Sequence, residues 1–169
     1  MVVVTVVTIS SLPKPLPPLA ADQFPSGSDA HSLALVEGTG PVMVDVYADP
    51  LCPACREADL AVTDTLERNV TSGRVTVKYH VLGNLDRYSN PTGYSSRASA
   101  AAGCAADQRL ARPYLHELFR HQPPEGSAGL SEADLIGIGV RVGADEGSFR
   151  MCVESGRYSL WVRHASEQA

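Results

Sequence analysis

Two cysteines separated by two residues are the feature of this sequence with the clearest chemistry. They are Cys52 and Cys55 of the segment CPAC, with Pro53 and Ala54 between them. A pair at this spacing can be a redox-active dithiol, half of a zinc site, or two inert thiols or a plain disulfide. The surrounding residues have to distinguish these kinds of site.

A helix is expected to begin at the pair, and its start would activate the first sulfur. Pro53 suits the first helical position, where a missing N–H group costs nothing. The sulfur of Cys52 would then face unpaired backbone N–H groups and the positive end of the helix dipole, which favour a thiolate. Cys55 would lie about one turn further along and be more buried. Cys52 is therefore the expected attacking sulfur and Cys55 the resolving one.

The other potential ligands do not favour a zinc site. Structural zinc usually takes two such pairs, or one pair and two closely spaced histidines. The other two cysteines, Cys104 and Cys152, stand alone in segments expected to be helical, and none of the five histidines has metal-ligand spacing with the cysteines. The sequence therefore favours a redox dithiol, and we expect neither a metal nor another cofactor.

The bulk composition is that of one globular domain. The chain has 169 residues, 44% of them hydrophobic and 20% charged. This length suits a single domain with a sizeable core. The formal net charge is −5 and no basic stretch interrupts it, which argues against nucleic acid as a partner.

Two unusual segments precede the expected domain. Residues 1–12 are uncharged and rich in β-branched side chains, so they can be the remnant of a signal or membrane anchor, an abbreviated signal, or a strand. Residues 13–29 contain five prolines, which predicts an extended linker or, as the alternative, a disordered arm. An apolar segment followed by a proline-rich linker is a common way to tether a domain outside a membrane.

The elements expected around the pair form a strand–helix–strand unit. Residues 32–36 are expected to form a short edge strand. The apolar run at 42–48 predicts a buried central strand, and the alternation at 74–82 predicts a further strand. A helix with apolar residues at helical spacing runs from the pair to about Asn69. This order predicts a parallel βαβ unit with the cysteines where strand passes into helix.

The rest of the chain is expected to be helical. Alanine-rich and amphipathic patterns follow one another, separated by glycine and proline. Ser131 and Asp134 are spaced as an N-terminal capping box. The helices are predicted over residues 98–108, 111–121, 131–140 and 148–166.

The segment VMVDVYADPLCPAC, followed by a helix, a strand and a helical block, resembles the thioredoxin superfamily and, more narrowly, the DsbA-like thiol-disulfide oxidoreductases of the cell envelope. The resemblance implies an α/β thioredoxin-like domain over residues 30–169, with an inserted helical domain at about 91–166. It also implies a catalytic pair, Cys52 and Cys55, that oxidises secreted proteins outside the cytoplasm. A membrane reoxidase that recycles the pair is the further partner that the resemblance implies.

The resemblance also assigns a supporting acid. Asp45 matches the acid that many thioredoxin-fold proteins bury beneath the pair, although it stands one residue further from Cys52 than expected, because ADPLC holds an extra residue. If it were buried there, desolvation would raise its pKa and it could relay a proton to Cys55. The alternative is an acid at a strand end that accepts hydrogen bonds from backbone N–H groups.

The resemblance also has implications for Ala54 and for the second pair of cysteines. DsbA usually carries histidine where this chain has Ala54, and alanine cannot stabilise the thiolate, which predicts a weaker oxidant than DsbA. In similar actinobacterial proteins a second cysteine pair staples the helical domain. This implies a structural disulfide between Cys104 and Cys152, with two buried free thiols as the alternative.

The resemblance is incomplete towards the C-terminus. Thioredoxin-fold oxidoreductases carry a cis-proline loop, a hairpin and a last helix after the helical insertion, and no proline follows Pro124 here. A C-terminally truncated fold is therefore expected, with an exposed sheet edge and exposed apolar surface. The alternative function is accordingly a degenerate or fragmentary thioredoxin-like domain that binds a partner without turnover.

Overall fold

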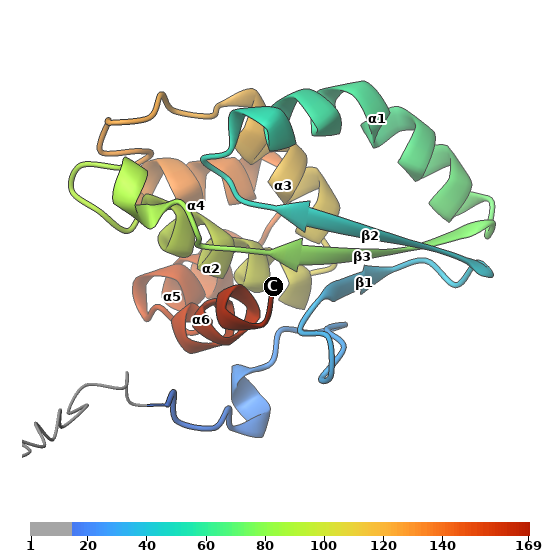
Figure 1. The fold of residues 1–169 in the computed structure, drawn as a ribbon, viewed down its shortest axis with the longest axis horizontal. Coiled ribbons are helices and arrows are strands. Elements are labelled where there is room, and N and C mark those ends of the chain that lie inside the picture. Colours follow the sequence, from blue (N-terminus) through green and yellow to red (C-terminus); the bar gives the residue numbers. More distant parts are fainter. Residues whose placement is uncertain (1–14) are drawn as a thin grey trace, which may run out of the picture.

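A computed structural model describes residues 15–169, and a three-stranded sheet lies at its centre (Figure 1). The strands are β1 (Leu35–Glu37), β2 (Val42–Ala48) and β3 (Val75–Val81), in the order β1-β3-β2. Strand β2 runs parallel to β3, and β1 runs antiparallel to it. The thioredoxin-like α/β class and the parallel βαβ unit are therefore confirmed. The apolar segment 1–12 lies outside the described residues.

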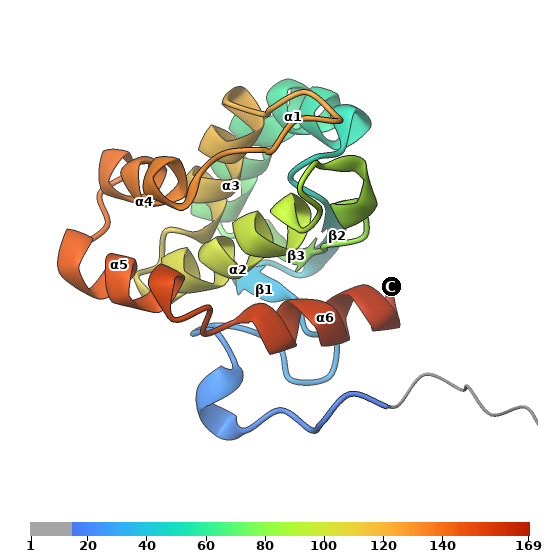
Figure 2. The same cartoon turned by 90° about the vertical axis from the view of Figure 1, so that its left-hand side faces the viewer.

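Helix α1 (Pro53–Thr71) follows β2 directly and ends two residues later than predicted. The parallel register pairs Tyr47 with His80 and Ala48 with Val81, so both strands end at the same edge of the sheet. The cysteine pair lies just beyond this edge, with Cys52 at the start of α1 and Cys55 in its first turn. Helices α1 and α6 lie on opposite sides of the sheet (Figure 2).

Strand β2 is not the buried central strand that its apolar sequence predicted. Strand β3 is central, and its Val77 and Val81 are fully buried. In β2 the side chains of Val42, Met43 and Tyr47 are 56%, 51% and 56% exposed. No strand within residues 15–169 pairs with the outer edge of β2. An apolar run indicates a strand but not how many neighbours it has, which explains the error.

Five helices follow the sheet and the short 3₁₀ turn η2 (Asp86–Tyr88). The last predicted helix, over residues 148–166, is in fact two helices. Gly156, at φ +59°, lies in the break between them, a left-handed conformation that glycine adopts at little cost. The five are α2 (Tyr94–Asp107), α3 (Ala111–Arg120), α4 (Glu132–Arg141), α5 (Glu146–Glu154) and α6 (Ser159–Gln168).

Helix α2 is the centre of the helical block because its side chains are small. It contacts α3, α4, α5 and α6. Buried alanines such as Ala98 and Ala102 let these neighbours approach closely, and Gly103 lies directly against the ring of Tyr158. None of the helices within residues 15–169 has both the length and the apolar character that crossing a bilayer requires.

Residues 15–29, the described part of the proline-rich segment, run along the helical block (Figure 2). They include one 3₁₀ turn, η1 (Ala21–Gln23). The backbone N–H of Ser26 donates to Asp107 at the end of α2 (2.9 Å), and the carbonyl of Pro17 lies 2.8 Å from the imidazole of His164 in α6. These contacts hold the segment against the domain.

Candidate active site

Cys52 is the N-cap residue of α1. Its sulfur accepts a hydrogen bond from the backbone N–H of Cys55 at 3.2 Å, and Pro53 occupies the first helical position. Both cysteines are half-buried free thiols. The first turn of the helix therefore directs a backbone N–H group at the sulfur that would attack a disulfide, as the sequence predicted for this position.

Cys55 is held as a thiol. Its sulfur donates to the carbonyl of Tyr47 at 3.8 Å. Burial raises the pKa of the Cys55 thiol to about 11, and the hydrogen bond with Cys52 acts in the same direction. A thiol that stays protonated at neutral pH is a poor attacking group, so the geometry suits Cys52 for attack and Cys55 for resolution.

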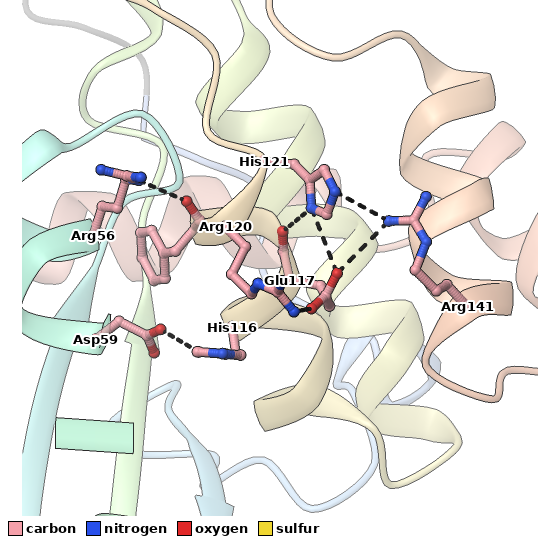
Figure 3. A network of polar contacts seen from close by, with 8 residues as sticks. Arg56, Asp59, His116, Glu117, Arg120, His121 and Arg141 are labelled. Atoms are coloured by element: carbon pink, nitrogen blue, oxygen red, sulfur yellow. Dashed lines mark hydrogen bonds and ion pairs between the residues drawn. The ribbon is translucent and has the colours of Figure 1, made fainter. Parts of the chain in front are cut away.

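Hydrogen bonds between α1, the loop that carries the pair and the helical block hold the loop in place. The amide nitrogen of Gln122, just after α3, donates to the carbonyls of Pro50 (3.0 Å) and Cys52 (2.9 Å). The guanidinium of Arg56 donates to the carbonyl of Phe119 in α3 at 3.0 Å (Figure 3). Sequence reasoning missed Gln122, because nothing local marks a residue some 70 positions away as a loop anchor.

A network of ionic groups joins α1, α3 and α4 behind these hydrogen bonds (Figure 3). The Oδ2 atom of Asp59 lies 2.6 Å from Nδ1 of His116, which links α1 to α3. Glu117 of α3 contacts Arg120 at 2.9 Å and Arg141 of α4 at 3.6 Å. Both arginines are more than half exposed, so these two pairs add little stability.

Asp45 is not buried beneath the cysteine pair, contrary to the assignment made by resemblance. Its side chain is 48% exposed, and its carboxylate lies 2.8 Å from Nε2 of His80. Side chains alternate between the two faces of a strand. Asp45 shares a face with Tyr47, beside α6, whereas Cys55 lies on the side of α1. The alternative, an acid bonded to backbone N–H groups at a strand end, is not found either.

The buried acid next to the pair is Asp49, which sequence reasoning missed. It is 5% exposed, and its Oδ1 accepts hydrogen bonds from the Leu51 N–H (2.9 Å) and the Ser95 hydroxyl (2.7 Å). Its Oδ2 accepts from the Leu85 N–H (2.9 Å). Burial raises the pKa of Asp49, and the three hydrogen bonds oppose the rise. The extra residue in ADPLC was the available signal, because it lengthens the turn in which Asp49 lies.

A hollow of about 190 Å³ opens beside the pair, between β2, α1 and α3. Cys55 lies in its wall, together with mainly apolar side chains such as Val46, Val62, Leu66 and Phe119. Val62 is 42% exposed, so part of this apolar wall faces solvent. The site therefore combines a dithiol with an adjoining apolar surface.

The remaining two cysteines form a disulfide away from the site. Cys104 of α2 is bonded to Cys152 of α5, the pairing that the resemblance implied. Within residues 15–169, no group of three or more His, Cys, Asp or Glu side chains is arranged to hold a metal ion.

Comparison with known sequences gives the family. A family model described as Thioredoxin matches residues 36–169. The serine/threonine-protein kinase PknE of Mycobacterium tuberculosis is 31% identical over 122 residues, which are 69% of this chain and 21% of the kinase. The chain thus spans about a fifth of the length of the curated relatives it matches.

Comparison with solved structures shows which members of the thioredoxin superfamily this chain resembles. The reduced disulfide bond oxidoreductase DsbG of M. tuberculosis has a TM-score of 0.67 and 31% identity, covering 75% of this chain and 67% of DsbG. Oxidised DsbA of M. tuberculosis has a TM-score of 0.68 and 30% identity, covering 79% of this chain and 74% of DsbA. The chain belongs to the thioredoxin family and is a DsbA-like member of that superfamily.

Proposed function

We propose that this protein is a thiol-disulfide oxidoreductase that exchanges disulfides with reduced, unfolded protein substrates through Cys52 and Cys55. The observation that carries the proposal is the unequal setting of the two sulfurs. The sulfur of Cys52 accepts a backbone N–H at 3.2 Å, whereas Cys55 is held protonated. The apolar hollow beside Cys55 suits an unfolded chain, which exposes apolar side chains.

Oxidation of a substrate follows from this arrangement in two steps. A substrate thiolate attacks the sulfur of Cys52; the Cys52–Cys55 bond breaks, and Cys55 leaves with the electron pair and takes up a proton. A second substrate thiolate then attacks the substrate sulfur of the mixed disulfide, and Cys52 leaves as a thiolate. The substrate dithiol has lost two electrons and the cysteine pair has gained them.

The pair must then be reoxidised, and the proposed electron acceptor is a membrane reoxidase. The proposed location is extracytoplasmic, in the cell envelope or secreted, and the substrates are secreted proteins. The disulfide between Cys104 and Cys152 supports this location, because such bonds persist mainly in oxidising compartments. In this proposal the apolar residues 1–12 contribute to export or to a membrane tether.

A second function, binding without turnover, is favoured by one observation. No strand within residues 15–169 covers the outer edge of β2, and the exposed Val42 and Met43 lie there. An open edge can bind an extended peptide by strand addition. Turnover distinguishes this function from the first.

Oxidative refolding of reduced, unfolded ribonuclease tests the proposal. The oxidised protein should accelerate the return of ribonuclease activity, and a Cys52→Ser variant should not. Cys55→Ser, mixed instead with ribonuclease that carries scrambled disulfides, should accumulate a mixed disulfide on Cys52 that is visible by mass spectrometry, because the Cys52 thiolate attacks a substrate disulfide and the resolving thiol is absent. Refolding no faster than with a variant that carries both serines, and no mixed disulfide, would favour binding without turnover.

A further inference from the structure

Strand β2 forms one edge of the sheet, and within residues 15–169 no strand pairs with its outer side (Figure 1). At the two ends of β2, the N–H of Val42 and the carbonyl of Ala48 form hydrogen bonds with residues that flank β3, at 3.4 and 2.8 Å. The main-chain groups of successive residues point to alternate sides of a strand. The groups that point to the outer edge are therefore those of Met43, Asp45 and Tyr47.

The outer edge of β2 ends at the cysteine pair. The carbonyl of Tyr47, one of the outward groups, accepts the thiol hydrogen of Cys55 at 3.8 Å. A carbonyl oxygen has a second lone pair, so it can accept a further N–H. The sulfur of Cys52 lies 3.2 Å from the backbone nitrogen of Cys55. A chain that lay along this edge would therefore reach both sulfurs at its end.

Both faces of the sheet offer an apolar contact beside this edge. On the side of α1, Val46 and Val62 line the hollow of about 190 Å³ that has Cys55 in its wall. On the side of α6, Tyr47 is 56% exposed and its ring stacks on His80, with 4.3 Å between the ring centroids. The side chains of an extended chain alternate between two faces. An added strand would thus place one apolar side chain in the hollow and the next against the ring of Tyr47.

The single charge on β2 disfavours a second copy of this chain as the occupant of the edge. Asp45 is the only charged residue of β2 and stands in the middle of the strand. Two β2 strands paired antiparallel about their centres would bring the two Asp45 side chains opposite each other, where like charges are destabilising. A foreign segment without an acid at that position has no such cost. The contact with Cys55 also suits a chain that has a thiol to exchange.

We propose that the outer edge of β2 binds the substrate of the cysteine pair: an extended apolar segment of an unfolded protein adds there as a strand and brings its own cysteine to Cys52. The inference rests on the proposed function, because it names how the substrate of the same pair is held. Strand addition uses main-chain hydrogen bonds that every sequence can form, and pockets for alternate side chains give the preference. The surface therefore fits many unfolded proteins that share apolar alternation and a cysteine.

Hydrogen exchange of the β2 amides in the reduced full chain tests this arrangement. The probe is a short cysteine-free peptide in which valine and threonine alternate, so that binding is measured without thiol exchange. At a peptide concentration about ten times the Kd, exchange at Met43, Asp45 and Tyr47 should slow about tenfold, because only the unbound fraction exchanges. The amides of Val44 and Val46 point towards β3, so their exchange should change less than about twofold.

The alternation of protection along the strand decides the result. Equal slowing at all of these amides, or slowing at none, would overturn the proposal. Slow exchange at the outward amides before any peptide is added would also overturn it, because a second copy or residues 1–12 would then cover the edge. Alternating protection in a chain that fails to refold ribonuclease would keep the binding edge and overturn the proposed oxidoreductase function instead.

A pair of variants at one position connects binding with turnover. Met43→Pro removes an outward N–H, a change that an edge strand tolerates, whereas Met43→Ala loses the same side chain and keeps the N–H. Refolding of reduced ribonuclease should be about tenfold slower with Met43→Pro than with Met43→Ala. Equal rates with the two variants would overturn the proposal. The exchange measurement needs no variant, so it applies even if Met43→Pro does not fold.

Discussion

Removing the disulfide between Cys104 and Cys152 should cost this protein a large part of its stability. The bond joins α2 to α5 across 48 residues, and the loop it closes contains α3 and α4. In the chain-entropy description, closing a loop of this length lowers the entropy of the unfolded chain and so stabilises the folded state by about 4 kcal/mol at 25 °C. This value lies between about 3 kcal/mol for a 15-residue loop and about 4.7 kcal/mol for a 100-residue loop. Replacement of both cysteines by alanine should therefore lower the free energy of unfolding by about 2–4 kcal/mol.

The expected loss is large enough to measure in two ways. At about 2–4 °C per kcal/mol for a domain of this size, the midpoint of thermal unfolding should fall by roughly 4–16 °C. Urea unfolding at 25 °C, followed by circular dichroism under oxidising conditions, gives the free energy directly. The matched control replaces Cys52 and Cys55 by alanine, because a disulfide in that pair would close a loop of only two intervening residues.

Two results would contradict the stabilising role of the disulfide between Cys104 and Cys152. A Cys104→Ala/Cys152→Ala variant whose free energy of unfolding lies within about 0.5 kcal/mol of the parent would mean that the cross-link does not limit the unfolded chain. A loss of the same size in the Cys52→Ala/Cys55→Ala control would mean that buried sulfur, and not the cross-link, is the cause. The two double variants therefore have to be measured side by side.

Three further predictions concern single sites. In a Cys52→Ala variant, the alkylation rate of Cys55, followed by mass spectrometry as the pH is raised, should have its midpoint above the ordinary thiol pKa of about 8.5. A midpoint at or below that value would contradict the conclusion that burial raises the pKa of Cys55. Gly139→Ala should destabilise the fold by about 1–3 kcal/mol in urea unfolding, because the added Cβ would overlap the ring of Phe149. Gly137→Ala on the same helix is the control: its added Cβ meets no atom within 4 Å, so this variant should be neutral or stabilising. Hydrogen bonds hold the pKa of Asp29 below its usual range, so its contribution to stability is complete above the unfolded pKa of about 4 and is lost as the pH falls through the lower folded pKa. The difference in free energy of unfolding between the parent and Asp29→Asn should therefore shrink over that pH range. A difference that stays constant would refute this assignment.

Local signals were sufficient to predict the elements that hold the cysteine pair. The strand at 42–48 agrees with β2 at both ends, and Pro53 marks the first residue of α1. These features depend on side-chain alternation, proline geometry and the preference of helices for certain first residues, all of which act over a few neighbouring residues. The strand–helix–strand order then restricted the topology to a parallel unit.

Features that depend on distant residues could not be predicted in the same way. The sequence of β2 does not contain the number of its neighbouring strands, so an edge strand was expected to be central. The break at Gly156 was missed because apolar residues continue on both sides of it. The contact of Gln122 with the cysteine loop exists only after α3 has packed beside α1.

The two aspartates near the pair show why the supporting acid was misassigned. Asp45 and Asp49 lie four residues apart, but the first is on a strand and the second is in the turn that follows it. On the strand, alternation fixes the side chain on the face away from Cys55, whatever the distance along the sequence. In the turn, the side chain is free to point inwards, and donors from Leu85 and Ser95 satisfy it there. Those donors belong to the segments after β3, as does Gln122, so the helical block takes part in building the site in addition to covering the sheet.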